Sequence, residues 1–234
     1  MVNTFIQNIR LEKYYRTIPI KICGGGSIMI KLYSITEWIY RLAFVNFLWI
    51  VFTLLGLVVF GIFPATMSMF SVIRKWVLSE PDPQIFRDFF KYYKRDFLKS
   101  NFIGLIFVIA GMIFYIYIQY IGATLDSILI YTHIPLYFFM VIVFLTFLYL
   151  PPVFVHYDVG FFQVFKNSFI IMIMNPIYTI VLVVSIVITV YVLKYIPGAL
   201  FFFGGSTISY TIMQICYLAF QNFENRKRKL TEVH

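Results

Sequence analysis

The chain has 234 residues, of which 61% are hydrophobic and only 12% are charged, and its formal net charge is +9. A water-soluble domain carries roughly 25% charged residues, so this composition excludes a soluble globular protein. The apolar runs are continuous and about twenty residues long, which is the length of a helical span and not the alternating pattern of a β-barrel. The sequence therefore predicts an all-α fold, a polytopic transmembrane helical bundle whose first partner is the lipid bilayer.

The excess of Lys and Arg flanks the apolar runs, as membrane topology requires. It is therefore not read as a nucleic-acid interface.

The N-terminal residues 1–28 form no signal peptide, because they lack a continuous apolar run and a small-residue cleavage site. Gly24, Gly25 and Gly26 precede Met29, and two adjacent glycine codons can spell the core of a bacterial ribosome-binding site. One interpretation is that residues 1–28 are a disordered or translated leader and that Met29 is the true start. The other is a short basic arm followed by a flexible glycine linker.

Between the basic segments lie apolar runs that predict a single transmembrane domain at residues 29–221. Residues 42–73 hold no charge, which is too long for one span and short for two. One span here would leave seven Lys and Arg residues outside, whereas two spans would leave only Lys194. The sequence therefore predicts six spans with both termini cytoplasmic, and a basic cytoplasmic tail at 222–234. The expected spans are 38–60, 64–79, 101–121, 131–155, 168–193 and 199–221.

The first two spans are expected to form a hairpin with an external turn at Gly61 to Pro64. Proline suits the first turn of the returning helix, where its missing N–H is not needed. Ala65, Ser68 and Ser71 follow at a spacing of three, so they share one face of that helix. Small side chains let neighbouring membrane helices approach closely, and this face is expected to pack against another helix.

Residues 84–98 are predicted to form an amphipathic helix in the cytoplasmic interface, because aromatic residues recur at helical spacing among basic ones. Two roles remain open for it. It either seals the cytoplasmic end of the bundle or docks a cytoplasmic partner or anionic lipid headgroups. Its candidate interaction residues are Phe86, Arg87, Asp88, Phe89 and Phe90.

Catalytic chemistry has no recognisable motif in the chain. The expected spans hold no central charged residue, which argues against an ion-coupled transporter. There is no Walker motif, no nucleophile elbow and no zinc-binding pattern, and the two cysteines, Cys23 and Cys216, are far apart. We therefore expect no enzyme, no cofactor and no metal.

Polar residues gather in the loop expected between the fourth and fifth spans. His156 and Asp158 are followed by Lys166 and Asn167. An acid–base pair is conceivable there, but a solvated ion pair between Asp158 and Lys166 is the favoured interpretation.

A second polar set lies in or near the spans and is expected to form hydrogen bonds between helices. Its members are Asn46, Gln119, Asn175 and Gln214.

Three blocks of sequence resemble the YesL-like family of bacterial integral membrane proteins of unknown function. They are "NFLWIVFTLLGLVVFGIFPATMSMFSVIRKWV", "IFRDFFKYYKRDFLKS" and "LPPVFVHYDVGFFQVFKNSFIIMIMNPI". The resemblance covers roughly residues 35–220 and brings no established active-site residues. It implies a location in the bacterial cell membrane and a link to carbohydrate utilisation, because genes of the family often neighbour sugar importers.

Two function classes follow from the resemblance together with the missing motifs. The first is a non-catalytic accessory or assembly factor of a carbohydrate uptake system, with importer subunits as partners. The alternative is a transport subunit that itself contacts the sugar.

Overall fold

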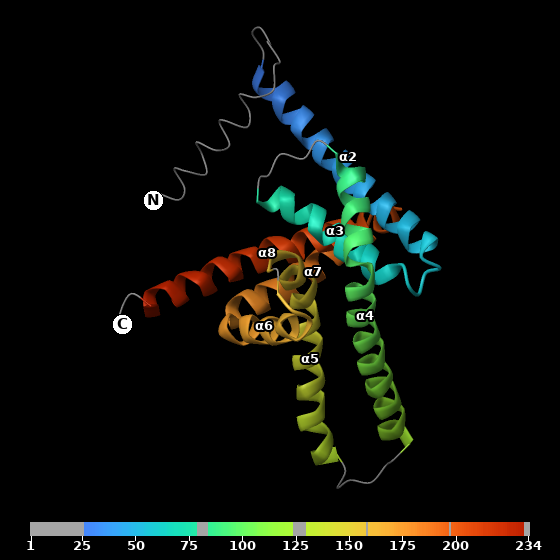
Figure 1. Ribbon diagram of the computed structural model, residues 1–234, viewed down its shortest axis with the longest axis vertical. Helices are drawn as coiled ribbons and strands as arrows, with labels where there is room; N and C mark the ends of the chain where they lie inside the picture. The colour runs from blue at the N-terminus through green and yellow to red at the C-terminus, as the bar shows by residue number, and fades with distance from the viewer. Residues whose placement is uncertain (1–25, 79–83, 124–129, 158, 197, 232–234) are drawn as a thin grey trace. The chain divides into compact units, whose positions relative to one another are not determined.

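The computed structural model describes residues 26–78, 84–123, 130–157, 159–196 and 198–231. This part of the chain is all helical and holds no strand, which confirms the predicted fold class. The described residues form seven helices, which are labelled in Figure 1: α2 (Gly26–Leu55), α3 (Ile62–Val77), α4 (Ile85–Ala123), α5 (Ile130–His156), α6 (Phe161–Met174), α7 (Pro176–Lys194) and α8 (Ala199–Thr231).

The chain divides into two units, Met1–Arg41 and Leu42–His234. In the first unit the structure describes the beginning of α2, where Arg41 pairs with Glu37 one turn earlier at 2.6 Å. The predicted leader, residues 1–28, lies outside the described residues except for its last three, which begin α2. In the second unit, the predicted tail continues α8 as helix as far as Thr231.

Five of the described helical stretches are long and apolar enough to cross a membrane, so the chain is a multi-pass membrane protein by length and composition. The remaining two helices, α3 and α6, are 16 and 14 residues long and fall short of span length. The five stretches are Tyr33–Leu55, Ile85–Gln119, Ile134–His156, Pro176–Lys194 and Ala199–Arg228.

The connection between α2 and α3 lies earlier than predicted, at residues 56–61 instead of 61–64. Gly56 and Gly61 set its place, because a Cβ on either one would collide with the backbone of the other. Leu57 and Val58 between them adopt left-handed backbone conformations, with φ of 56° and 63°. Such conformations cost on the order of 1–3 kcal/mol each in a non-glycine residue. Pro64 lies inside the first turn of α3 and not in the connection.

The predicted helix at 84–98 and the predicted span at 101–121 are one continuous helix, α4, so the expected break between them is wrong. No Pro or Gly lies at the junction to end a helix. Asn101 keeps its side chain on the helix, where it donates a hydrogen bond to the Phe97 carbonyl at 2.9 Å.

The predicted span at 168–193 is divided at Asn175, which separates α6 from α7. Pro176 is the physical reason, because a proline lacks the N–H that a continuous helix would need and disfavours helical backbone in the residue before it. Asn175 accordingly leaves the helical region, with φ −129° and ψ 60°. The apolar run that looked like one long span is therefore a short helix followed by a 19-residue one.

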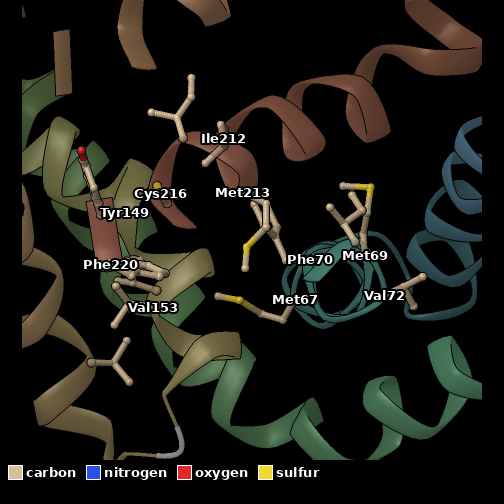
Figure 2. Packing of buried hydrophobic residues seen from close by; sticks show 14 of the residues in the cluster. Met67, Met69, Phe70, Val72, Tyr149, Val153, Ile212, Met213, Cys216 and Phe220 are labelled. Carbon is tan, nitrogen blue, oxygen red and sulfur yellow. The ribbon is translucent and has the colours of Figure 1, made fainter. Parts of the chain in front are cut away.

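The core of the second unit is built around α3, in which ten of the sixteen residues are buried. This helix packs on α4, α5 and α8. Figure 2 shows Met67 and Phe70 of α3 facing Met213 of α8, while Tyr149 of α5 lies beside Cys216 of α8. The shorter helix of the predicted hairpin, α3, is thus enclosed by protein over most of its residues.

Candidate functional site

The small face of α3 is buried within the protein, where Ala65, Ser68 and Ser71 are at most 5% exposed. Both serine hydroxyls donate to carbonyls of their own helix, Ser68 to Pro64 at 2.7 Å and Ser71 to Met67 at 2.9 Å. The face therefore presents no free polar hydrogen to a neighbour and acts through its small volume. No residue of this face offers a reactive group to a ligand.

Contacts also join α2 to α3, as the predicted hairpin requires. The indole Nε1–H of Trp49 donates to the hydroxyl of Thr66 at 3.0 Å. The two helices are therefore held together by a specific hydrogen bond in addition to their short connection.

The first turns of α4 divide their candidate residues between the core and the surface. Phe89 is fully buried, with its ring centroid 5.2 Å from that of Phe52 in α2, so it faces protein and not the bilayer. Phe86 and Phe90 stack on each other at 6.4 Å and are 55% and 39% exposed. The apolar stripe that predicted an interfacial helix is thus partly a core contact, because α2 supplies a ring for it to pack against.

The two charged candidates of this segment make polar contacts of different kinds. Asp88 forms an ion pair with Lys75 of α3 at 2.6 Å, and each side chain is about four-fifths buried. Arg87 donates to Gln84 of its own segment at 3.2 Å. Asp88 therefore fixes α4 to the end of α3, whereas Arg87 lies on the surface.

A polar cluster lies where the ends of α3 and α5 meet α8. The hydroxyl of Tyr157 donates to Oε1 of Glu224 at 3.3 Å. The ring of His156 lies 4.8 Å from that of Phe220, and the charges of Arg74 and Glu224 both act on it. Three helices thus contribute titratable groups to one place, which we call the α3–α5–α8 cluster (Arg74, His156, Tyr157 and Glu224).

Two polar atoms in this cluster are buried without a hydrogen-bond partner. They are Nδ1 of His156 and Nε of Arg74. Burial raises the pKa of the Tyr157 hydroxyl above its ordinary value, and the neighbouring carboxylate of Glu224 raises that pKa further. Tyr157 therefore stays a hydrogen-bond donor at neutral pH, and the cluster combines the Arg74 cation with a tyrosine–carboxylate pair.

The other predicted members of the loop set are not brought into this cluster. Asp158 lies outside the described residues, so its expected ion pair with Lys166 stays a prediction. Lys166 and Asn167 belong to α6 and not to a loop. Lys166 is exposed, Asn167 is half-buried, and no hydrogen bond or ion pair joins either of them to His156.

The predicted hydrogen bonds between helices are confirmed for two of the four polar residues. Asn46 of α2 donates to the Phe201 carbonyl of α8 at 2.8 Å and accepts from the Ser206 N–H at 3.2 Å. Asn175 accepts a hydrogen bond from Asn222 of α8 at 2.8 Å. The expectation was wrong for the other two, because Gln119 and Gln214 bond to tyrosines one turn away in their own helices.

The break at Asn175 carries polar contacts that the sequence reading missed. The hydroxyl of Thr179 is hydrogen-bonded to that of Tyr149 at 3.0 Å, and Arg226 donates to the carbonyl of Met174 at 3.3 Å. The Thr179 hydroxyl also lies within hydrogen-bond distance of the carbonyls of Met172, at 3.3 Å, and Asn175, at 3.1 Å. Side chains thus supply partners for carbonyls that the interrupted helix leaves without an N–H. The dipeptide Asn175–Pro176 indicates the end of a helix, but the long apolar run around it favoured the prediction of a single span.

Comparison with known proteins identifies relatives over most of the chain. A family model described as "Protein of unknown function, DUF624" matches residues 42–118, from the second half of α2 into α4. No solved structure matches the chain.

Three proteins of Bacillus subtilis (strain 168) are similar over most of their length. "Uncharacterized protein YesL" is 34% identical over 195 residues, which is 82% of this chain and 90% of the relative. "Uncharacterized protein YteU" is 35% identical over 195 residues, or 80% and 84% of the two chains. "Uncharacterized protein YesV" is 30% identical over 193 residues, or 82% and 93%. The resemblance found in the sequence is confirmed, and the chain belongs to the YesL-like family.

Proposed function

We propose that this protein is a non-catalytic accessory or assembly factor of a bacterial carbohydrate uptake system. The observation that carries the proposal is that most of the polar residues buried in the described part of the bundle are hydrogen-bonded within the chain. Asn46, Ser68 and the Tyr149–Thr179 pair direct their hydrogen bonds to other parts of the same chain. A sugar pathway needs polar groups that are free to exchange hydrogen bonds with hydroxyls. The carbohydrate role itself rests on the family resemblance.

We propose the six-span topology as part of this function, with α3 as a short span and both termini in the cytoplasm. At 16 residues α3 measures about 24 Å, so the bilayer thins locally around it. The positive-inside rule supports this topology, since every Lys and Arg except Lys194 then lies inside. In this arrangement the exposed Phe86 and Phe90, with Lys94 4.4 Å above the Phe90 ring, meet the cytoplasmic membrane surface. Importer subunits would then meet the protein in the bilayer or at this surface.

The direct test is purification of the tagged chain from native membranes in a mild detergent. We expect the permease subunits of a sugar importer to co-purify with it, and not with an unrelated multi-pass protein that carries the same tag. Deletion of the gene should lower the amount of assembled importer. Normal assembly in the deletion strain, together with no co-purified subunit, would contradict the proposal.

Transport by the chain itself is the competing function, and the unpartnered atoms of Arg74 and His156 favour it. Liposomes that contain only the purified chain distinguish the two functions. An accessory factor leaves labelled sugar outside, at the rate of empty liposomes. Uptake by the chain alone would make it a transport subunit.

A further inference from the structure

The position of α6 along the chain places it at a membrane surface. The helix before it, α5, ends at His156, and α7 begins at Pro176, and both neighbours are long enough to cross the bilayer. At 14 residues α6 measures about 21 Å, which is too short for a crossing of about 30 Å. Because α6 does not cross the bilayer, the end of α5 and the beginning of α7 lie at the same face of the membrane. The helix α6 between them therefore lies at that face.

The surface of α6 has three chemically different sides. One side is buried against α5 and α8, and it includes Val164 and Ser168, which are at most 1% exposed. A second side is apolar and open, with Phe162 84%, Phe169 42% and Ile173 54% exposed. The polar residues Gln163 and Asn167 share a third side, because they are four positions apart. A helix lying in an interface needs these three sides, which face protein, lipid and water.

The charge on and beside α6 is positive. The helix contains no Asp or Glu, and Lys166 projects from its open side. Arg226 of α8 is exposed and donates a hydrogen bond to the carbonyl of Met174 at the end of α6. One cation thus lies in the first half of α6 and a second at its C-terminal end, which complements anionic headgroups.

We propose that α6 is a lipid-binding surface, seated in the headgroup layer of the cytoplasmic leaflet. Phe162, Phe169 and Ile173 enter the boundary of the acyl chains, and Lys166 and Arg226 bind the phosphates of anionic phospholipids. The proposal rests on the membrane crossings of α5 and α7, and the assignment to the cytoplasmic leaflet also rests on the proposed six-span topology. It does not depend on a role in carbohydrate uptake.

Spin labels on the full chain in lipid nanodiscs test the depth of α6. A label at Phe162 or Phe169 should collide with oxygen and be shielded from a water-soluble nickel chelate. A label at Gln163 should show the reverse. Nickel access at position 162 would overturn the proposal, and so would shielding of that label from both reagents, which indicates a covering protein or a second copy.

The lipid preference is tested by comparing nanodiscs of phosphatidylcholine with nanodiscs that also contain phosphatidylglycerol. We expect anionic lipid to be enriched beside a fluorophore on α6, and each of Lys166→Gln and Arg226→Gln to lower the enrichment about fivefold. Lys166→Arg keeps the charge and should keep the enrichment. Lys194→Gln, at the far end of α7, is the matched control for loss of one cation. Equal lipid composition beside the parent and the Lys166→Gln variant would overturn the role of the charges.

Discussion

At the scale of single residues, Ser68 shows how a polar side chain is placed in the apolar interior of this protein. Its side chain is 1% exposed, and its hydroxyl is bonded to the carbonyl four residues earlier in the same helix. Helices in lipid lack a strong hydrophobic drive to associate and depend on close contact between small residues. Ser68 therefore contributes to stability by being small.

Replacement of Ser68 by Leu should lower the free energy of unfolding by about 1–3 kcal/mol, because the larger side chain has no space. Ser68→Ala keeps the small volume and is the matched control, with a change below about 1 kcal/mol. Lys94→Ala, on an exposed surface, should change the stability by about 0–1 kcal/mol. Thermal unfolding in detergent measures all three. A Ser68→Leu variant as stable as the parent would show that α3 is not tightly packed here.

The pair of Tyr157 and Glu224 is a second residue-scale test, because its hydrogen bond joins two helices. Tyr157→Phe should lower the stability by about 1–1.5 kcal/mol, a modest value for a bond to a carboxylate because its length is 3.3 Å. The effect should disappear in a Glu224→Gln background if the bond is its cause. Tyr217→Phe removes a neighbouring hydroxyl that forms no hydrogen bond in the described structure and should have no effect.

This contribution of Tyr157 should not change with pH across the neutral range. Its pKa is raised in the folded protein, so the stabilising effect is fully present below the unfolded value of about 10 and is lost only above it. The difference in stability between the parent and Tyr157→Phe should therefore be the same at pH 7 and pH 9. A difference that shrinks over this interval would show that the hydroxyl loses its proton in the folded state.

At the scale of helices, the contact between α3 and α4 depends on a glycine. A Cβ at Gly104 of α4 would overlap the ring of Phe63, because three ring carbons lie 2.1–2.5 Å from where it would be. The Phe63 ring also makes an edge-to-face contact with the ring of Phe107, with the two centroids 6.4 Å apart. Together with the ion pair between Lys75 and Asp88, this contact fixes both ends of α3 along α4.

Gly104→Ala should therefore loosen the pair and lower the stability by about 1–3 kcal/mol, the usual effect of overpacking. Gly111→Ala on the same helix is the matched control, because open space surrounds that position. It should be neutral or stabilise by up to about 1 kcal/mol, as alanine favours a helix over glycine. In a Phe63→Ala background the effect of Gly104→Ala should vanish. If Gly104→Ala still lowers the stability in the Phe63→Ala background, the overlap with the Phe63 ring is not its cause.

Helix content could be predicted from the sequence because apolar length and charge position determine it locally. The ends of helices were harder, and the reasons are specific. Asn175–Pro176 is a local signal for the end of a helix, but it lies inside a long apolar run that predicts one continuous span. The junction before Asn101 contains no such signal, and only a change in charge there suggested two separate helices. The α3–α5–α8 cluster could not be found this way, because Arg74 and Glu224 are 150 residues apart and only packing brings them to His156.

At the scale of the whole molecule, the proposed topology makes opposite predictions for two exposed positions. Val59 lies in the connection between α2 and α3 and should be external, whereas Lys91 lies near the start of α4 and should be cytoplasmic. In a chain whose two native cysteines are replaced, Val59→Cys should react with an impermeant thiol reagent added to intact cells. Lys91→Cys should react only after the membrane is made permeable. Protection of position 59 from outside would instead favour five spans.

The unbroken course of α4 has a consequence for what surrounds it. A helix of 39 residues is about 58 Å long, roughly twice the thickness of the hydrocarbon core. Its basic half is held to α3 through Asp88 and Gly104, while its apolar half beyond Gly104 is largely exposed. The contacts to α3 therefore lie in the first half of α4, and the exposed apolar side chains of its far half need lipid or another membrane protein to cover them.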